Sequence, residues 1–284
     1  QFLEYQAFQK IIEKLVSIHS EEPLFHLILA DIYAKDKQYQ QAIEEYYLSL
    51  YSGYIKDDYV YNKLIQMYWQ QENITELLEV TLAAIERYPF SPEFYYYQGL
   101  ALSTQSKYEL SLEGLLKGID YIFDNDLLKS DFYSLMGDIY HKLENHQESD
   151  KSYIKALTYN PNNTLVLNNY SYYLSQREEN LSEAKDMIVK CLALSEGTQN
   201  ASYIDTYAWV LYKLGEYNLA KDQIEQALKI NDKSPVILDH YGDILHKLGM
   251  KEDALIYWKK SYELDSSNTG LKDKIINNSQ NEYF

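Results

Sequence analysis

The chain contains the stretch "NNYSYYLSQREENLSEAKDMIVKCL" at residues 168–192 and, soon after it, "DTYAWVLYKLGEYNLAKDQIEQALK" at residues 205–229. Both stretches open on an aromatic run, pass a polar turn and reach an Ala-Lys-Asp step. Each then continues with apolar residues at helical spacing. The chain therefore repeats one pattern, and the length of that repeat decides the fold.

Small residues set the length of the repeat. Ala208 and Gly242 are 34 residues apart, and so are Ala220 and Ala254. Extended in both directions, this frame predicts seven repeats that start near residues 23, 58, 92, 130, 164, 201 and 235. Self-similarity at a period of about 34 residues is typical of a solenoid built from helix pairs.

Each repeat has the pattern of two amphipathic helices. In the repeat that starts near residue 201, Ile204 and Leu211 mark the apolar face of a first helix. Gly215 ends that helix, and Ala220 and Ile224 mark the apolar face of a second one. All five prolines of the chain fall at predicted repeat boundaries, where helices begin or end.

Several recurring positions carry a family resemblance. Gly or Ala occupies the eighth position, Gly or a polar residue the fifteenth, Tyr the seventeenth, Ala the twentieth and Pro the thirty-second. This pattern resembles the tetratricopeptide repeat (TPR) over residues 23–268. The resemblance implies an all-α fold, a right-handed superhelical solenoid of about seven TPR-like helix pairs. Residues 1–22 are then the second helix of a truncated preceding repeat, and residues 269–284 a capping helix and tail.

Three repeats depart from the pattern. The repeat near residue 58 has Ile65 and Leu77 at its eighth and twentieth positions, so we expect this helix pair to be splayed or shifted. The repeats near residues 92 and 164 are stretched by four and three residues. We expect the extra residues of the first near 121–130. Those of the second are expected in the turn 176–182 and near 195–200.

The composition argues against several classes of function. The net charge is −17 and we find no basic cluster, so nucleic acid is not an expected partner. No apolar run reaches the ~18 residues of a membrane span. We expect that any membrane anchor would belong to a segment that precedes this sequence. The six histidines lack metal-ligand spacing, no catalytic motif occurs, and Cys191 is interpreted as a buried, inert thiol. We therefore expect no enzyme, metal or cofactor.

The TPR resemblance implies that positions two, five, nine, twelve and thirteen of each repeat line a concave groove. The candidate partner-binding residues at these positions are Tyr59, Asn62, Trp69, Tyr96, Asp138, Asn168, Tyr172, Asp205, Trp209, Tyr212, Asp239 and Asp243. Asp205 and Asp239 share the fifth position and are expected side by side, near Trp209. Such a patch suits a lysine or arginine stacked on Trp209. The alternative is that the tyrosines merely follow the total of 31 and the charges are solvated.

The expected function is a non-enzymatic protein–protein interaction scaffold that binds a basic or polar-aromatic partner segment in its groove. An anionic tail is expected to bind poorly. The last three repeats also resemble long TPR proteins, lipoproteins of the Bacteroidota cell envelope. That resemblance implies a lipid-anchored periplasmic protein, and a cytoplasmic location stays open. Two other functions stay open, a regulatory or recruiting arm of a larger enzyme or secretion machine and an oligomerisation module. Whether the chain forms a homo-oligomer is left open as well.

Overall fold

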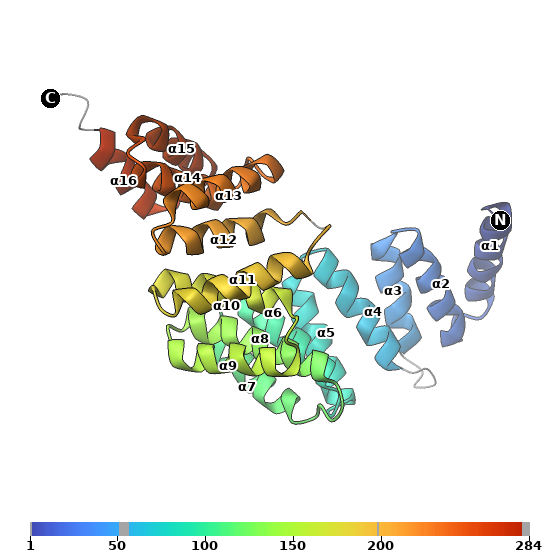
Figure 1. The fold of residues 1–284 in the computed structure, drawn as a ribbon. Helices are drawn as coiled ribbons and strands as arrows, with labels where there is room; N and C mark the ends of the chain where they lie inside the picture. Colours follow the sequence, from blue (N-terminus) through green and yellow to red (C-terminus); the bar gives the residue numbers. More distant parts are fainter. Residues whose placement is uncertain (1, 51–56, 198, 280–284) are drawn as a thin grey trace. The chain divides into compact units, whose positions relative to one another are not determined.

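The computed structural model describes residues 2–50, 57–197 and 199–279, and every regular element in these ranges is an α-helix (Figure 1). The chain divides into two compact units, residues 1–128 (unit 1) and residues 129–284 (unit 2). Among the described helices, none combines the length and the apolar character that crossing a bilayer requires.

Unit 1 is built from helices that follow one another through short turns. Their bounds are α1 (Phe2–Ile18), α2 (Pro23–Lys35), α3 (Tyr39–Leu50), α4 (Asp57–Gln70), α5 (Ile74–Arg87), α6 (Pro92–Thr104) and α7 (Tyr108–Ile119). The next helix, α8 (Asp126–Lys142), begins at the end of unit 1 and lies mainly in unit 2.

Unit 2 continues the same alternation. After α8 come α9 (His146–Tyr159), α10 (Thr164–Arg177), α11 (Leu181–Leu194), α12 (Ala201–Lys213), α13 (Tyr217–Ile230), α14 (Pro235–Lys247), α15 (Lys251–Leu264) and α16 (Thr269–Ser279). From α2 to α15 the described helices form seven pairs, each with a first helix (helix A) and a second helix (helix B). α1 precedes these pairs and α16 follows them. The predicted all-α solenoid of helix pairs is confirmed.

The fourth pair begins earlier than the sequence pattern predicted. α8 starts at Asp126, whereas the repeat frame put that start near residue 130. The side chain of Asn125 accepts a hydrogen bond from the backbone N–H of Leu128 at 3.0 Å, which stabilises the new helix start. The extra residues that the sequence assigned to the end of the preceding repeat therefore lengthen α8, the helix A of the fourth pair, by about one turn.

The turn from helix A to helix B needs a left-handed residue at the fifteenth position. Gly215 and Gly249 take this conformation, with φ of 80° and 81°. Lys37, Glu72 and Ser106 take it with a side chain present, with φ of 60°, 55° and 58°. Glycine adopts this region without steric cost, and other residues accept some strain there. The tight turn thus explains why Gly or a polar residue recurs at this position.

Inside a pair, glycine at the eighth position lets helix B press a large ring against helix A. A Cβ atom built on Gly137 of α8 would lie 2.7 Å from the ring of Tyr153 on α9. One built on Gly242 of α14 would lie 2.4 Å from the indole of Trp258 on α15. Both rings are buried, so the small residue and the ring fill one shared volume.

The pair α4–α5 reverses these sizes. Ile65 occupies the eighth position and Thr81 the twenty-fourth, the positions that hold Gly242 and Trp258 in the pair α14–α15, and both are buried. α4 and α5 pack less closely than α2 and α3, in the direction that Ile65 and Leu77 predicted. The exchange of large and small residues keeps the core filled although the two helices stand further apart.

Cys191 of α11 is fully buried, and burial raises the pKa of its thiol to about 11. Only about one thiol in a thousand is then ionised at pH 8, and the thiolate is the reactive form. We expect a disulfide reagent such as DTNB to label the folded protein at pH 8 far more slowly than the urea-unfolded chain. Equal rates for the two states would show that the packing of α11 does not protect this thiol.

Candidate partner-binding face

The candidate residues of unit 2 lie on one surface, formed by the exposed sides of α8, α10, α12 and α14. We call it the helix-A face of unit 2. Neighbouring helices A contact each other there, with α12 against both α10 and α14. The face is therefore a continuous surface over several repeats, and its side chains can interact from one repeat to the next.

Carboxylates on this face are joined to the following helix A. Asp205 of α12 lies with Oδ1 at 2.8 Å from Nδ1 of His240 on α14, and both side chains are only 6% exposed. Asp138 of α8 accepts hydrogen bonds from Nδ2 of Asn169 on α10 at 3.1 Å and from the hydroxyl of Tyr153 at 2.5 Å. These carboxylates connect helices within the protein rather than facing solvent alone.

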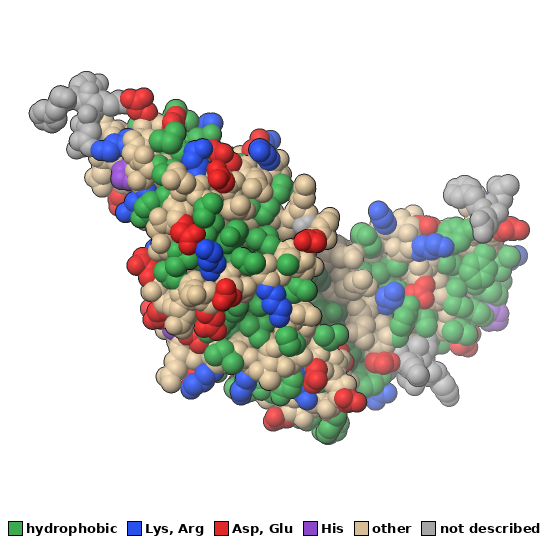
Figure 2. Space-filling model, viewed as in Figure 1, with side chains coloured by type: hydrophobic (Ala, Val, Ile, Leu, Met, Phe, Trp, Pro, Cys, Tyr) green, Lys and Arg blue, Asp and Glu red, His purple; other side chains and the backbone are tan. Residues whose placement is uncertain are grey.

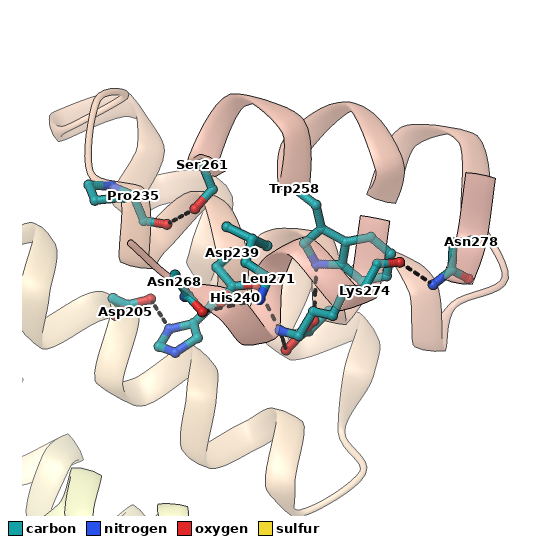
Figure 3. Close-up of polar contacts among 11 residues, drawn as sticks. Asp205, Pro235, Asp239, His240, Trp258, Ser261, Asn268, Leu271, Lys274 and Asn278 are labelled. Atoms are coloured by element: carbon teal, nitrogen blue, oxygen red, sulfur yellow. Dashed lines mark hydrogen bonds and ion pairs between the residues drawn. The ribbon is translucent and has the colours of Figure 1, made fainter. Parts of the chain in front are cut away.

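At the end of unit 2 the same connection is made by Lys274 of α16 (Figure 3). Its Nζ lies 2.8 Å from Oδ1 of Asp239 and 2.7 Å from Oδ2 of Asp243, both on α14. Oδ1 of Asp243 also accepts a hydrogen bond from Nε1 of Trp258 at 3.0 Å. The two acidic candidates of the last repeat therefore share one intramolecular cation.

Burial and charge shift the pKa values of these groups. Burial alone lowers the pKa of His240, but the carboxylates of Asp205, Asp239 and Asp243 outweigh it, so the pKa lies above its ordinary value. Burial raises the pKa of Asp243 and that of Asp138, although their hydrogen-bond donors and nearby cations act in the opposite direction. His240 therefore holds its proton more readily than an exposed histidine does.

Groups of the chain itself surround Trp209, where the sequence placed a cation site. The ring of Trp209 stacks on Tyr212 at 4.7 Å and on His240 at 4.1 Å between centroids, and Nζ of Lys213 lies 5.3 Å from its ring centre. Asp205 is buried against His240. The chain's own rings and cation thus occupy the places that the sequence assigned to a partner's lysine or arginine.

Several buried polar atoms on the helices of this face have no hydrogen-bond partner in the protein. Within the described residues, five buried side-chain nitrogen or oxygen atoms have no hydrogen-bond partner in the protein. Four of them stand on α8, α10 and α12, at positions that the sequence assigned to a groove. They are Ser134 Oγ, His141 Nδ1, Asn168 Oδ1 and Trp209 Nε1, and the fifth is Arg177 Nη1. Asn168 and Trp209 were candidates from the sequence, whereas Ser134 and His141 were not singled out because residue type gave no sign of an unmet hydrogen bond.

His141 is neutral at physiological pH. Burial, the neighbouring His146 and the charge of Lys142 lower its pKa to about 4. Its ring stacks on Tyr173 at 3.6 Å between centroids and lies 5.7 Å from the ring of His146. In the part of the chain that the structure describes, no three His, Cys, Asp or Glu side chains come together as a metal-ligand set. A neutral His141 can donate or accept a hydrogen bond.

Tyr172 completes the candidates of this face. It is half-buried, and its ring lies 6.2 Å from that of His240. Burial raises the pKa of its hydroxyl, with the nearby carboxylate of Asp205 adding to the effect. Tyr172 thus presents an un-ionised hydroxyl beside the stacked rings of Trp209 and His240.

The candidates of unit 1 are more exposed. Tyr59 and Trp69 are 41% and 42% exposed, and Asn62 is exposed as well. The hydroxyl of Tyr59 donates to Oδ1 of Asp31 at 2.9 Å. Tyr96 is half-buried, with its ring 5.9 Å from that of Tyr97. These side chains could contact a partner without any rearrangement of unit 1.

Unit 1 also holds a basic pocket that the sequence did not reveal. It has a volume of about 380 Å³ and is lined by residues of α2, α4 and the turn after α2, among them Asp31, Tyr59, Lys35, Lys37 and Lys63. The sequence showed no basic cluster, whereas three lysines and Asp31 line this pocket in the folded chain. Lys35 and Lys37 lie close together in the sequence, and Lys63 of α4 joins them only in the folded chain.

Consecutive helix pairs with a continuous helix-A face are the features of an α-solenoid repeat protein. The model of the tetratricopeptide repeat family matches residues 4–267, so the chain belongs to that family. Proteins with this fold generally serve as protein–protein interaction scaffolds and are typically not catalysts.

Solved structures with the same fold are similar over nearly the whole chain. The APC/C hetero-tetramer Cut9–Hcn1 matches with a TM-score of 0.71 at 12% identity, over 96% of this chain and 52% of that one. A TPR protein from Parabacteroides merdae matches with 0.66 at 14%, over 94% and 98%. Yeast Tom70 matches with 0.57 at 12%, over 97% and 58%. This chain thus spans about half the length of the first of them. A comparison with curated protein sequences gave no match.

Proposed function

We propose that the chain is a non-enzymatic scaffold that binds an extended segment of a partner protein along the helix-A face of unit 2. The observation that carries the proposal is the set of unsatisfied buried polar atoms on α8, α10 and α12. Buried polar groups are hydrogen-bonded in the great majority of cases, and leaving one unpaired costs about 1–3 kcal/mol. Four such atoms at positions of one face favour a polar partner there, whose binding would open the packing that now covers these atoms.

The chemistry of these atoms fits a polypeptide backbone. Trp209 Nε1 can only donate and would take a carbonyl oxygen, whereas Asn168 Oδ1 can only accept and would take an N–H. The hydroxyl of Ser134 and the neutral ring of His141 can do either. An extended segment offers both kinds of group at every residue, about 3.3 Å apart. Because the carboxylates nearby are already paired, a polar or aromatic segment suits this part of the face.

The setting that we propose is an assembly of the bacterial cell envelope. The resemblance of the last three repeats to long envelope TPR proteins supports this setting. The alternative, a recruiting arm of a larger machine, uses the same face and the same contacts.

Site-specific cross-linking tests which face binds. Leu165 lies at the second position of α10 and is 51% exposed on the helix-A face, whereas Val189 of α11 is 45% exposed on the helix-B side. Figure 2 shows apolar side chains among charged ones on the surface over α9 and α11. A benzophenone amino acid at position 165 should cross-link a partner in cells that make the protein, and the same group at 189 should not. Equal yields at the two positions would refute the choice of face.

The isolated partner then allows a sharper measurement. Trp209→Phe removes the unsatisfied Nε1 and keeps most of the stacked ring, so it should weaken binding about tenfold, the loss expected for one buried hydrogen bond. Tyr203→Phe serves as the matched control, since its hydroxyl lies 3.4 Å from Thr164 Oγ1 and away from the unsatisfied atoms. Unchanged affinity for Trp209→Phe would remove Trp209 from the site.

A further inference from the structure

Lys274 is bound by α14 in the manner of a ligand. Its ammonium contacts one oxygen of Asp239 at 2.8 Å and one of Asp243 at 2.7 Å, and it lies 5.9 Å from the centre of the Trp258 ring (Figure 3). Two carboxylates and an aromatic ring around one cation combine charge-assisted hydrogen bonds with a cation–π contact. We call Asp239, Asp243 and Trp258 the acidic subsite.

The two carboxylates of the acidic subsite carry more charge than the single ammonium of Lys274 can neutralise. Asp239 and Asp243 have side chains that are 17% and 14% exposed, and they share one ammonium. Asp205 lies nearby, paired with His240. Because the desolvation of two carboxylates is offset only if a cation is present, the subsite selects for an ammonium group whichever chain provides it.

The helix that carries Lys274 is only lightly held. Within the described part of α16, Leu271 is its one buried residue, whereas α14 contributes seven. Ile275 is half-buried, Ile276 is 44% exposed, and the remaining links are polar, such as the contact between Asn278 Oδ1 and His246 Nε2 at 3.2 Å. Segments with few buried apolar contacts open at a small fraction of the global unfolding free energy. Local opening of α16 would leave the acidic subsite without its cation.

We propose that the acidic subsite is a lysine-binding site of the helix-A face, filled by Lys274 in the free protein and by a lysine of the partner segment in the complex. The inference rests on the proposed function, because it names the chemistry of the segment at one end of the same face. The partner lysine takes the place of Lys274 when α16 withdraws, so α16 acts as an internal competitor. A partner then needs a lysine at this end and polar groups further along.

The probe for this test is a short acetylated and amidated Gly/Ser peptide with two lysines, compared with the same peptide in which norleucine replaces lysine. Lys274→Met removes the competing ammonium, and the buried Leu271 still anchors α16. Lys272→Met is the matched control, since it removes one exposed lysine from the same helix and changes the net charge equally. We expect Lys274→Met to bind the lysine peptide at least about tenfold more tightly than Lys272→Met does, because no internal ammonium then competes for the carboxylates of Asp239 and Asp243. Adding Asp239→Asn to Lys274→Met should abolish the gain.

Hydrogen exchange of the unmutated protein gives a second measurement. Saturating lysine peptide should speed the exchange of α16 amides, residues 269–279, and leave those of α14 unchanged. If Lys274→Met binds the lysine peptide no better than Lys272→Met, or if bound peptide leaves the exchange of α16 unaltered, the inference is wrong. Cross-linking at position 165 reports on α10 alone, so a failure here with success there would remove the lysine subsite and leave the proposed function standing.

Discussion

Asp205→Ala should destabilise unit 2 by about 3–5 kcal/mol, the range found when one partner of a buried ion pair is removed. The carboxylate contacts His240 at 2.8 Å, and both side chains are 6% exposed. Without it the imidazole of His240 stays buried, stacked on Trp209, and loses the group that favours its charged form. Urea unfolding followed by circular dichroism measures the loss. Asp205→Asn keeps an acceptor for Nδ1 and should cost only about 1–2 kcal/mol.

The cost of Asp205→Ala should depend on pH in a defined direction. Burial lowers the pKa of His240, but Asp205, Asp239 and Asp243 raise it more, so the folded pKa lies above the ordinary value. A group whose pKa is raised by folding contributes stability that is complete below its unfolded pKa of about 6.5 and is lost as the pH rises through the folded value. The difference between wild type and Asp205→Ala should therefore be largest near pH 6 and shrink toward pH 9. A difference that stays constant between pH 6 and pH 9 would mean that His240 is neutral in the folded protein.

The sequence predicted which residues share a face but not which of them are already satisfied. Asp205 and Asp239 both occupy the fifth position of a repeat. Helical periodicity alone determines which face of the helix that position lies on, so the sequence placed both residues on the helix-A face. Their partners, His240 and Lys274, each stand 35 residues further on, at the sixth position of the next helix A. Reading the chain at this offset would have found both pairs. Periodicity within one helix carries no information about contacts between helices.

Other features depended on contacts that no local pattern encodes. Lys35, Lys37 and Lys63 line the basic pocket of unit 1 and come from two helices and a turn. No run of basic residues in the sequence therefore predicts this pocket. The unsatisfied atoms of Ser134 and His141 follow from the burial of common residue types. The early start of α8 at Asp126 follows from one side chain, Asn125, that accepts a hydrogen bond from Leu128. The repeat frame, in contrast, rests on many positions at once, which is why it predicted the helix pairs.

Gly242→Ala should destabilise unit 2 by about 2–3 kcal/mol, although alanine favours a helix over glycine by about 1 kcal/mol. The added Cβ would lie 2.4 Å from both Cδ1 and Nε1 of the Trp258 indole. That ring is 2% exposed, and its Nε1 is held by Asp243, so it has no free space to move into. Gly114→Ala on α7 is the control. There the new Cβ meets only the end of the flexible Gln98 side chain, so the substitution should be neutral or stabilising by up to about 1 kcal/mol.

A double-mutant cycle shows whether the indole is the cause. The preceding repeat has Ala208 and Ile224 at the positions of Gly242 and Trp258, and both are fully buried. In a Trp258→Ile background the repeat near residue 235 takes the same pair of residues, so Gly242→Ala should change from destabilising to stabilising by up to about 1 kcal/mol. The coupling between the two sites should then be about 3 kcal/mol in urea unfolding, at the upper end for residues in contact. A coupling near zero would mean that the glycine is kept for the backbone of α14 and not for the ring of α15, and the size rule between positions eight and twenty-four would lose its physical basis.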